Sequence, residues 1–180
     1  MRIVAGRWGG RRLSAPAGRT TRPTSDRVRE ALFALLGPLD GLAVLDLFAG
    51  SGALGIEALS RGATHATFVD SAPAAIRAVE ANLAALAVDP AAAEVRRQDA
   101  RAFLRGARAA GRQYDLVLLD PPYRLAAKLG RELSPSLAGV LAAGGRLVAE
   151  SDRRAPLDLG LPLTDERRYG DTLIRIHEPE

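Results

Sequence analysis

Short apolar runs and amphipathic stretches alternate along most of this chain. Runs rich in Val, Leu and Ile that are bounded by turn residues predict strands, whereas apolar residues three or four positions apart predict helices. Strands are expected at 43–47, 65–69, 93–97, 114–119, 146–150 and 172–177. Helices are expected near 53–61, 72–86, 100–110 and 125–141, the last broken around the Ser-Pro pair at 134–135. This order predicts an α/β fold with a doubly wound, parallel sheet and right-handed crossovers.

The N-terminal region departs from this alternation. An apolar start, a Gly-Gly turn at residues 9–10 and a short return segment predict a small β-hairpin. Residues 24–26 are Thr-Ser-Asp, whose side-chain oxygens suit the N-cap of a helix, and Gly37 would end that helix. We therefore expect a hairpin, loop and helix at 1–37, followed by the main domain at 38–180.

Positive charge is concentrated in the same N-terminal region. Residues 1–36 hold eight arginines and two acids, a net charge of +6, whereas the rest hold 17 basic and 19 acidic side chains, a net charge of −2. A basic arm on a near-neutral body indicates a phosphate-rich partner. A general preference for arginine would explain why only one of 25 basic residues is lysine, but not the clustering. The expected RNA contacts are Arg7, Arg11, Arg12 and Arg22.

Composition narrows the class of protein. Cysteine is absent, and His65 and His177 are the only histidines, so neither a disulfide nor a Cys- or His-based metal site is expected. No apolar stretch approaches the length of a membrane span. With 180 residues and 47% hydrophobic content, the chain is long enough for one domain with a real core. We expect a cytoplasmic, monomeric protein without a membrane or metal partner.

A small-residue loop follows the first predicted strand of the main domain. Glycines in such a loop let a ligand approach the backbone, and the amides of the following helix point toward it. Acids at the ends of successive parallel strands would line the same crevice and could hold amino, hydroxyl and base groups. The candidate ligand-binding residues are Asp46, Phe48, Gly50, Ser51, Gly52, Asp70 and Asp99. Asp99 could instead simply cap the next helix.

The glycine loop alone leaves two ligand classes open. Residues 50–55 match the dinucleotide fingerprint, and Asp70 stands at the distance expected for a ribose-binding acid. Asp46, however, would place an acid near a dinucleotide's pyrophosphate, whereas it suits a ligand with a sulfonium and an amino group. The chain also lacks an obvious acid–base pair for hydride-transfer chemistry.

The segment Asp120-Pro121-Pro122-Tyr123 is the second candidate site. It follows the apolar run 114–119, so it lies at the carboxyl end of a strand, where open α/β sheets bind ligands. Asp120 can accept hydrogen bonds from an amine, the prolines leave carbonyl acceptors without amide donors, and Tyr123 offers a ring on which a base can stack. These residues suit an amine that must be held and aligned.

Together, these motifs resemble the class I S-adenosylmethionine (SAM) methyltransferases. The pattern at 46–52 with Asp120-Pro121-Pro122-Tyr123 is similar to the branch that methylates exocyclic base amines. The segments 2–6, 10–13, 21–33, 45–62 and 169–172 resemble the RsmD family. The resemblance implies a Rossmann-like fold with a mostly parallel seven-stranded sheet. It also implies SAM as cofactor and methylation of a guanine N2 in 16S rRNA, within a partly or fully assembled small ribosomal subunit.

Other functions remain open from the residues alone. The core motif does not separate guanine N2 from adenine N6 or from a DNA amine. A nicotinamide-dependent oxidoreductase would use the same glycine loop, and a catalytically idle RNA-binding module could retain the fold.

Overall fold

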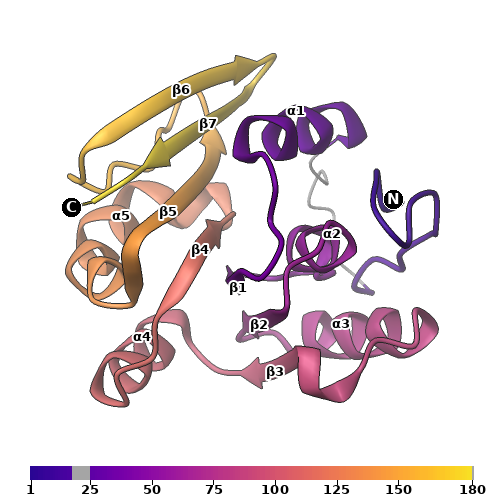
Figure 1. Ribbon diagram of the computed structural model, residues 1–180. Coiled ribbons are helices and arrows are strands. Elements are labelled where there is room, and N and C mark those ends of the chain that lie inside the picture. The colour runs from indigo at the N-terminus through magenta and orange to yellow at the C-terminus, as the bar shows by residue number, and fades with distance from the viewer. Residues whose placement is uncertain (18–24, 180) are drawn as a thin grey trace.

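A seven-stranded sheet forms the centre of the molecule (Figure 1). The computed structural model describes residues 1–17 and 25–179, except for the side chains at 123–128. The strands are β1 (Ala43–Leu47), β2 (His65–Asp70), β3 (Ala93–Arg97), β4 (Tyr114–Leu119), β5 (Leu141–Asp152), β6 (Leu163–Tyr169) and β7 (Thr172–His177). The helices are α1 (Asp26–Leu36), α2 (Ala53–Ser60), α3 (Pro73–Ala85), α4 (Ala100–Ala109) and α5 (Tyr123–Ala138), with a 3₁₀ turn η1 (Pro90–Ala92).

The strand order confirms the predicted doubly wound sheet. In space the order is β3-β2-β1-β4-β5-β7-β6, and only β7 runs antiparallel to its neighbours. The chain therefore winds outward from β1 in both directions, and the order reverses between β1 and β4. Ligands bind at such a switch point, beyond the carboxyl ends of the strands.

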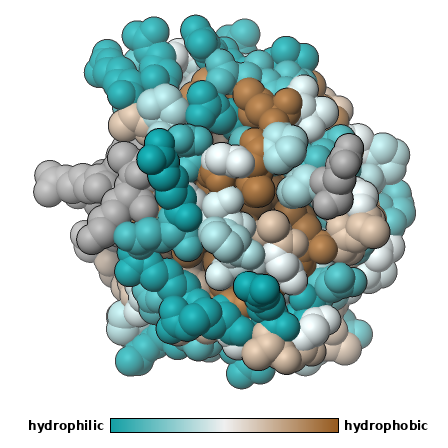
Figure 2. All heavy atoms as spheres, turned by 90° about the vertical axis from the view of Figure 1, so that its left-hand side faces the viewer, coloured by the Kyte–Doolittle hydropathy of each residue, from teal (hydrophilic) through white to brown (hydrophobic). Residues whose placement is uncertain are grey.

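Helices cover both faces of the sheet, which explains why the central strands read as continuous apolar runs. Val44 of β1 packs into the core on the side of α1, α2 and α3, and the next residue, Leu45, packs into the core on the side of α4 and α5. The same alternation continues in β4 through Leu116 and Val117. On the side that is left in Figure 1, hydrophobic residues gather in a central strip that hydrophilic residues surround (Figure 2).

The N-terminal region has the predicted elements. Arg2 and Arg12 form an antiparallel bridge, and the N–H of Ile3 donates to the Arg11 carbonyl over 2.9 Å. Ser25 caps α1 through a bond from the N–H of Val28, and Gly37 ends the helix with a φ of 69°. Ile3 is fully buried in the core shared with α1, α2 and α3.

Two predictions about elements were wrong, and one strand was not predicted. Helix α5 is not broken at the Ser-Pro pair but runs through Pro135, because Leu129, Leu133 and Leu137 keep one buried stripe across that position. Strand β5 begins five residues before the predicted start, with a register irregularity opposite β4 near its beginning. Strand β6 was not predicted, because it is a polar edge strand without a buried face.

Candidate active site

The strand registers bring three predicted segments to one level of the sheet. Leu47 of β1 pairs with Val69 of β2 and with Leu119 of β4. The residues that follow these positions, Phe48, Asp70 and Asp120, therefore emerge side by side at the carboxyl-end edge. The structure thus places the acid of the Asp-Pro-Pro-Tyr segment beside the glycine loop, as the sequence predicts.

The loop after β1 has an unusual backbone. Phe48, Gly50 and Gly52 have φ values of 74°, 57° and 78°. Glycine adopts such angles without steric cost, whereas a bulky residue such as Phe48 does so only when its surroundings hold it there. The N–H groups of Phe48 and Ala49 both donate to the carbonyl of Val69, over 2.9 and 3.0 Å. Strand β2 therefore fixes a strained turn of the kind found at ligand sites.

Asp70 holds the same loop with its side chain. Its Oδ2 accepts from the N–H of Gly50 over 3.0 Å, and its Oδ1 accepts from the N–H of Ala72 over 2.8 Å. The residue is buried. Asp70 thus joins the end of β2 to both the glycine loop and the start of α3.

Asp46 is an almost completely buried acid, with 2% of its surface exposed. Its Oδ2 accepts from the N–H of Gly55 over 2.9 Å. Burial raises the pKa of Asp46 to about 7, and the nearby Asp70 carboxylate adds to the rise, while the Gly55 bond opposes it. Two acids close together in a buried site favour a ligand that carries positive charge.

Gly55 lets helix α2 approach β2 closely. A Cβ at this position would lie 2.4 Å from Cε1 of Phe68 and 3.1 Å from Cβ of Asp46. No side chain fits there without displacing the ring. The third glycine of the fingerprint therefore serves helix–strand packing, which keeps the first turn of α2 against the acid.

Asp99 stands as the N-cap of α4. Its Oδ1 accepts from the N–H groups of Arg101 and Ala102, over 3.0 and 3.2 Å, and the residue is exposed. The capping role that the sequence left open is present. The same position, two residues after the end of β3, also lies along the carboxyl-end edge.

The Asp-Pro-Pro-Tyr segment connects β4 to α5. Asp120 is half-buried, Pro121 is buried, and Pro122 is the N-cap residue of α5. The side chain of Tyr123 lies outside the described part of the structure. The backbone nevertheless places this residue at the first position of α5, four residues after β4 ends.

Asn82 is a buried residue that the sequence analysis missed. Its Nδ2 donates to the carbonyls of Ser51 and Ser14 over 2.9 and 3.0 Å, and its Oδ1 accepts from the N–H of Ser14 over 2.8 Å. This one amide joins α3, the glycine loop and the N-terminal region. A polar residue within the buried apolar stripe of α3 is the signal that could have identified it.

Glu57 of α2 and Arg29 of α1 hold the N-terminal hairpin through hydrogen bonds to its backbone. Glu57 is fully buried, accepts from the N–H groups of Val4 and Ala5 over 2.7 and 3.0 Å, and pairs with Arg61 over 2.8 Å. Nη1 of the fully buried Arg29 lies 3.8 Å from its Oε2. The arginine belongs to the N-terminal basic cluster, yet its role here is structural.

Two hairpin arginines, Arg7 and Arg11, lie away from the strand-end crevice. The N–H of Arg7 donates to the carbonyl of Ser60, the last residue of α2, and its guanidinium lies 3.9 Å from the centre of the Trp8 ring. Arg11 donates to the carbonyl of Ala85 at the end of α3. These helix ends lie at the amino-end edge of the sheet. Trp8 is partly buried and packs against the core.

Arg12 and Arg22 complete the predicted basic set. Arg12 is exposed and bridges Arg2, whereas Arg22 lies outside the described residues. Over the ranges 1–17 and 25–179, no group of three or more His, Asp or Glu side chains is placed to hold a metal ion. No helix within those ranges has the length and apolar character needed to cross a membrane.

One protein family and several known proteins are similar to this chain, most of them over nearly its whole length. The family described as conserved hypothetical protein 95 matches residues 1–178. The "Putative rRNA methyltransferase YlbH" of Bacillus subtilis is 41% identical over 187 residues, which cover 99% of this chain and 98% of that protein. The "Ribosomal RNA small subunit methyltransferase D" of Escherichia coli K12 is 43% identical over 125 residues, which cover 69% of this chain and 61% of that protein. The solved structure of a hypothetical protein from Thermus thermophilus is 34% identical, with a TM-score of 0.86 over 99% of both chains.

Proposed function

The chain belongs to the conserved hypothetical protein 95 family, the RsmD family of methyltransferases, and on this premise we propose that it methylates the exocyclic N2 amine of a guanine in 16S rRNA, with SAM as the methyl donor. The observation that carries the proposal is the common level of Phe48, Asp70 and Asp120 at the switch point of the sheet. That geometry supports the proposal because it sets the proposed cofactor loop beside the proposed amine-binding segment.

The chemistry of the site fits SAM. Asp46 and Asp70 are both buried and close enough for one carboxylate to raise the pKa of the other. A sulfonium and an ammonium group would relieve that repulsion, whereas a pyrophosphate would add to it. At Gly50 a Cβ would meet no atom closer than 3.9 Å, so the left-handed glycine leaves no side chain there between the loop and a ligand. The side that Gly52 leaves bare instead faces the core, where a Cβ would lie 3.2 Å from Val79 and 3.3 Å from Phe68.

Each acid of the proposed SAM-binding set would contact a different part of the ligand. Asp46 would face its methionine end, Asp70 the ribose hydroxyls and Asp99 the adenine. Both oxygens of Asp70 accept loop N–H groups, and a carboxylate oxygen can accept more than one hydrogen bond, so the ribose hydroxyls would share them. The full proposed set is Asp46, Phe48, Gly50, Ser51, Gly52, Asp70 and Asp99.

The proposed catalytic segment is Asp120-Pro121-Pro122-Tyr123. The guanine would be turned out of its stack into the crevice, with Tyr123 beneath the base. The Asp120 carboxylate and the Pro121 carbonyl would each accept a hydrogen bond from one of the two N2 hydrogens. These bonds would favour a pyramidal nitrogen whose lone pair points out of the ring plane. SAM, when bound, would supply the electrophilic methyl group: the N–C bond would form as the S–C bond breaks, the neutral thioether would leave, and the amine would lose one proton to water. Catalysis by the chain's own residues is then alignment and charge matching.

We further propose that the enzyme acts as a monomer in the cytoplasm, on a partly or fully assembled small subunit. Arg7, Arg11, Arg12 and Arg22 would contact phosphates of the surrounding rRNA. Since Arg7 and Arg11 lie at the amino-end edge, their contacts would be remote from the target guanine.

Methyl transfer to small ribosomal subunits that lack the modification tests this function. Radiolabelled SAM would supply the label, and mass spectrometry of the digested RNA would identify the methylated nucleoside. We expect N2-methylguanosine. N6-methyladenosine would retain the mechanism but overturn the substrate, and unlabelled RNA with intact SAM binding would favour another substrate or an idle fold. Binding of NAD in place of SAM would favour the oxidoreductase.

A further inference from the structure

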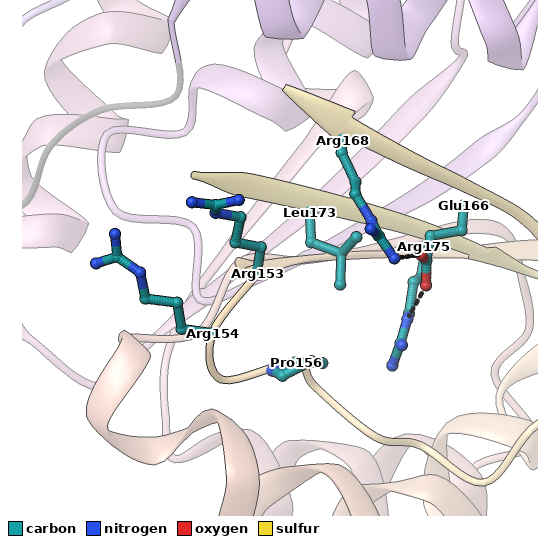
Figure 3. A pocket seen from close by; sticks show the side chains of 7 residues that line it. All are labelled: Arg153, Arg154, Pro156, Glu166, Arg168, Leu173 and Arg175. Carbon is teal, nitrogen blue, oxygen red and sulfur yellow. Dashed lines mark hydrogen bonds and ion pairs between the residues drawn. The ribbon is translucent and has the colours of Figure 1, made fainter. Parts of the chain in front are cut away.

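A second basic surface lies at the end of β5 and along the β6–β7 pair. Four arginines surround a pocket of about 260 Å³, which Figure 3 shows from close by. We refer to Arg153, Arg154, Arg168 and Arg175 together as the arginine pocket. Sequence-level charge counting did not find it, because its arginines are interspersed with acids along the chain.

Strand pairing explains how these side chains gather. Glu166 of β6 is directly opposite Arg175 of β7, and Arg168 is directly opposite Leu173. Residues two apart on a strand point to the same face, so these two cross-strand pairs lie on one face of the β6–β7 pair. The turn that follows β5 carries the other two arginines to the same place (Figure 3).

The acids within reach leave the pocket positive. Glu166 accepts from Arg175 and Arg168, each over 3.0 Å. Asp171 lies 3.3 and 3.7 Å from the guanidinium nitrogens of the two turn arginines. Four cations thus share two carboxylates. The side chains of Arg154 and Arg168 are each 73% exposed, so their remaining donors face solvent.

The arginine pocket lies at the carboxyl-end edge of the sheet, unlike Arg7 and Arg11 of the hairpin. Leu119 pairs with Ala149 of β5, so the next position along β4, Asp120, is level with Glu150. Ser151, one residue further, pairs with Leu173, the partner of Arg168. The pocket is therefore about one residue beyond the level of Asp120 and three strand spacings away, about 14 Å across the sheet.

We propose that the arginine pocket binds the phosphodiester backbone of the RNA strand that carries the target nucleotide. The inference rests on the proposed rRNA methylation, and it names the surface that would hold the strand near the crevice. Planar guanidinium groups with several donors suit phosphate oxygens. A flipped base needs its flanking backbone held at the same edge of the sheet, and Arg7 and Arg11 lie at the opposite one.

The salt dependence of RNA binding tests this proposal. The test variant is Arg154→Gln with Arg168→Gln, which removes two exposed charges and leaves Arg175 on Glu166. The matched control is Arg77→Gln with Arg105→Gln, two exposed arginines on α3 and α4. Each protein would be titrated with protein-free 16S rRNA over a range of salt concentrations, with SAM affinity and thermal denaturation measured in parallel.

We expect the test variant to bind RNA more weakly and to lower the slope of log K against log salt by about 0.7–0.9 for each phosphate that it no longer neutralises. SAM affinity should not change, and the control should retain the wild-type slope. Equal slopes for the test variant and the wild type would overturn the proposal. If only binding to protein-containing subunits weakened, the pocket would instead face an acidic protein.

Two safeguards keep this result separate from other failures. If the test variant folds poorly, a second variant, Arg153→Gln with Arg154→Gln, alters only the turn after β5. This second variant should lower the slope of log K against log salt in the same way. Failure of methyl transfer by the wild type would overturn the proposed function, whereas the slope comparison would still decide whether the pocket contacts RNA. A wild-type protein that does not bind RNA would overturn both.

Discussion

Oδ2 of Asp70 accepts a hydrogen bond from the N–H of Gly50 over 3.0 Å, so the acid that ends β2 holds the loop that ends β1. Its other oxygen holds the N–H of Ala72 at the start of α3. The loop conformation therefore depends on a residue 20 positions away in the sequence. This dependence makes Asp70 a structural part of the proposed cofactor site as well as a candidate ligand to it.

Replacing Asp70 with alanine should weaken SAM binding about tenfold or more. Two partly buried N–H groups would lose their acceptor, at a cost of about 1–3 kcal/mol each, and the loop would lose the contacts that hold its conformation. Calorimetric titration with SAM measures the effect. Asp89→Ala is the matched control, because Asp89 also accepts a backbone N–H, from Ala91, but lies at the exposed start of η1. Equal losses in the two variants would contradict the assignment.

SAM affinity should rise with pH through about 7. The pKa of buried Asp46 is raised to about 7, so its carboxyl is largely protonated below that pH and cannot attract a cation. A bound cation favours the charged form and lowers this pKa, so binding releases a proton. Affinity at pH 6 should be about tenfold lower than at pH 8. Titration of SAM in Asp46→Asn corrects for the ligand's own ionisation, and a pH dependence unchanged in this variant would exclude Asp46 as the cause.

Asp120→Ala should reduce the rate of methyl transfer far more than SAM binding. The carboxylate is proposed to orient the amine, and removal of one group that stabilises a transition state typically costs about 10²–10³ in rate. Single-turnover methylation of subunits gives the rate, and calorimetry gives the SAM affinity. Parallel losses in rate and in SAM affinity would indicate instead that Asp120 supports the fold of the cofactor site.

Glu57→Ala should destabilise the protein strongly without touching the proposed site. It removes the acceptor for two hairpin N–H groups and the carboxylate that lies 3.8 Å from the fully buried Arg29, which keeps its bond to Asp26. Two N–H groups left without an acceptor cost about 1–3 kcal/mol each, which corresponds to a fall in Tm of about 4–24 °C at this chain length. Thermal denaturation measures this. Glu30→Ala, at an exposed position of α1, should leave Tm nearly unchanged.

Gly55→Ala should destabilise the fold and lower SAM affinity. The new methyl group would overlap Phe68, since a Cβ there lies 2.4 Å from the ring, and α2 would have to move away from β2. Overpacking of this kind costs about 1–3 kcal/mol. Gly106→Ala in α4 is the control, because no atom lies within 4 Å of its Cβ position, and there alanine should stabilise the helix slightly. Denaturant unfolding of both variants checks the contrast.

Much of the fold was predictable because the central strands are buried on both faces. In β1 and β4 most positions are apolar, so Asp46 in an otherwise apolar strand stands out as a candidate site residue. The match over residues 1–178 confirms the predicted family. By contrast, β6 escaped prediction because its polar sequence lacks a buried face, and the start of β5 was hidden by the Gly-Gly pair at 144–145.

The polar contacts between distant segments were not predictable from one sequence. Asn82 and Glu57 lie on helices whose apolar spacing gives no hint of a partner in the N-terminal region. The arginine pocket forms only because β6 and β7 pair in one particular register. Such relationships depend on three-dimensional neighbours, whereas the glycine loop and the Asp-Pro-Pro-Tyr segment are local patterns.

Asn82 has a thermodynamic consequence for the order of binding. One amide bonds the carbonyls of both Ser51, in the glycine loop, and Ser14, in the N-terminal region. Restraint of either segment narrows the freedom of the other, and this coupling must be reciprocal. To the extent that SAM fixes the loop and RNA fixes the arm, each tightens the other by the same factor. Under the proposed function, an enzyme without bound SAM would then release its RNA more readily, because one buried side chain joins the two binding segments.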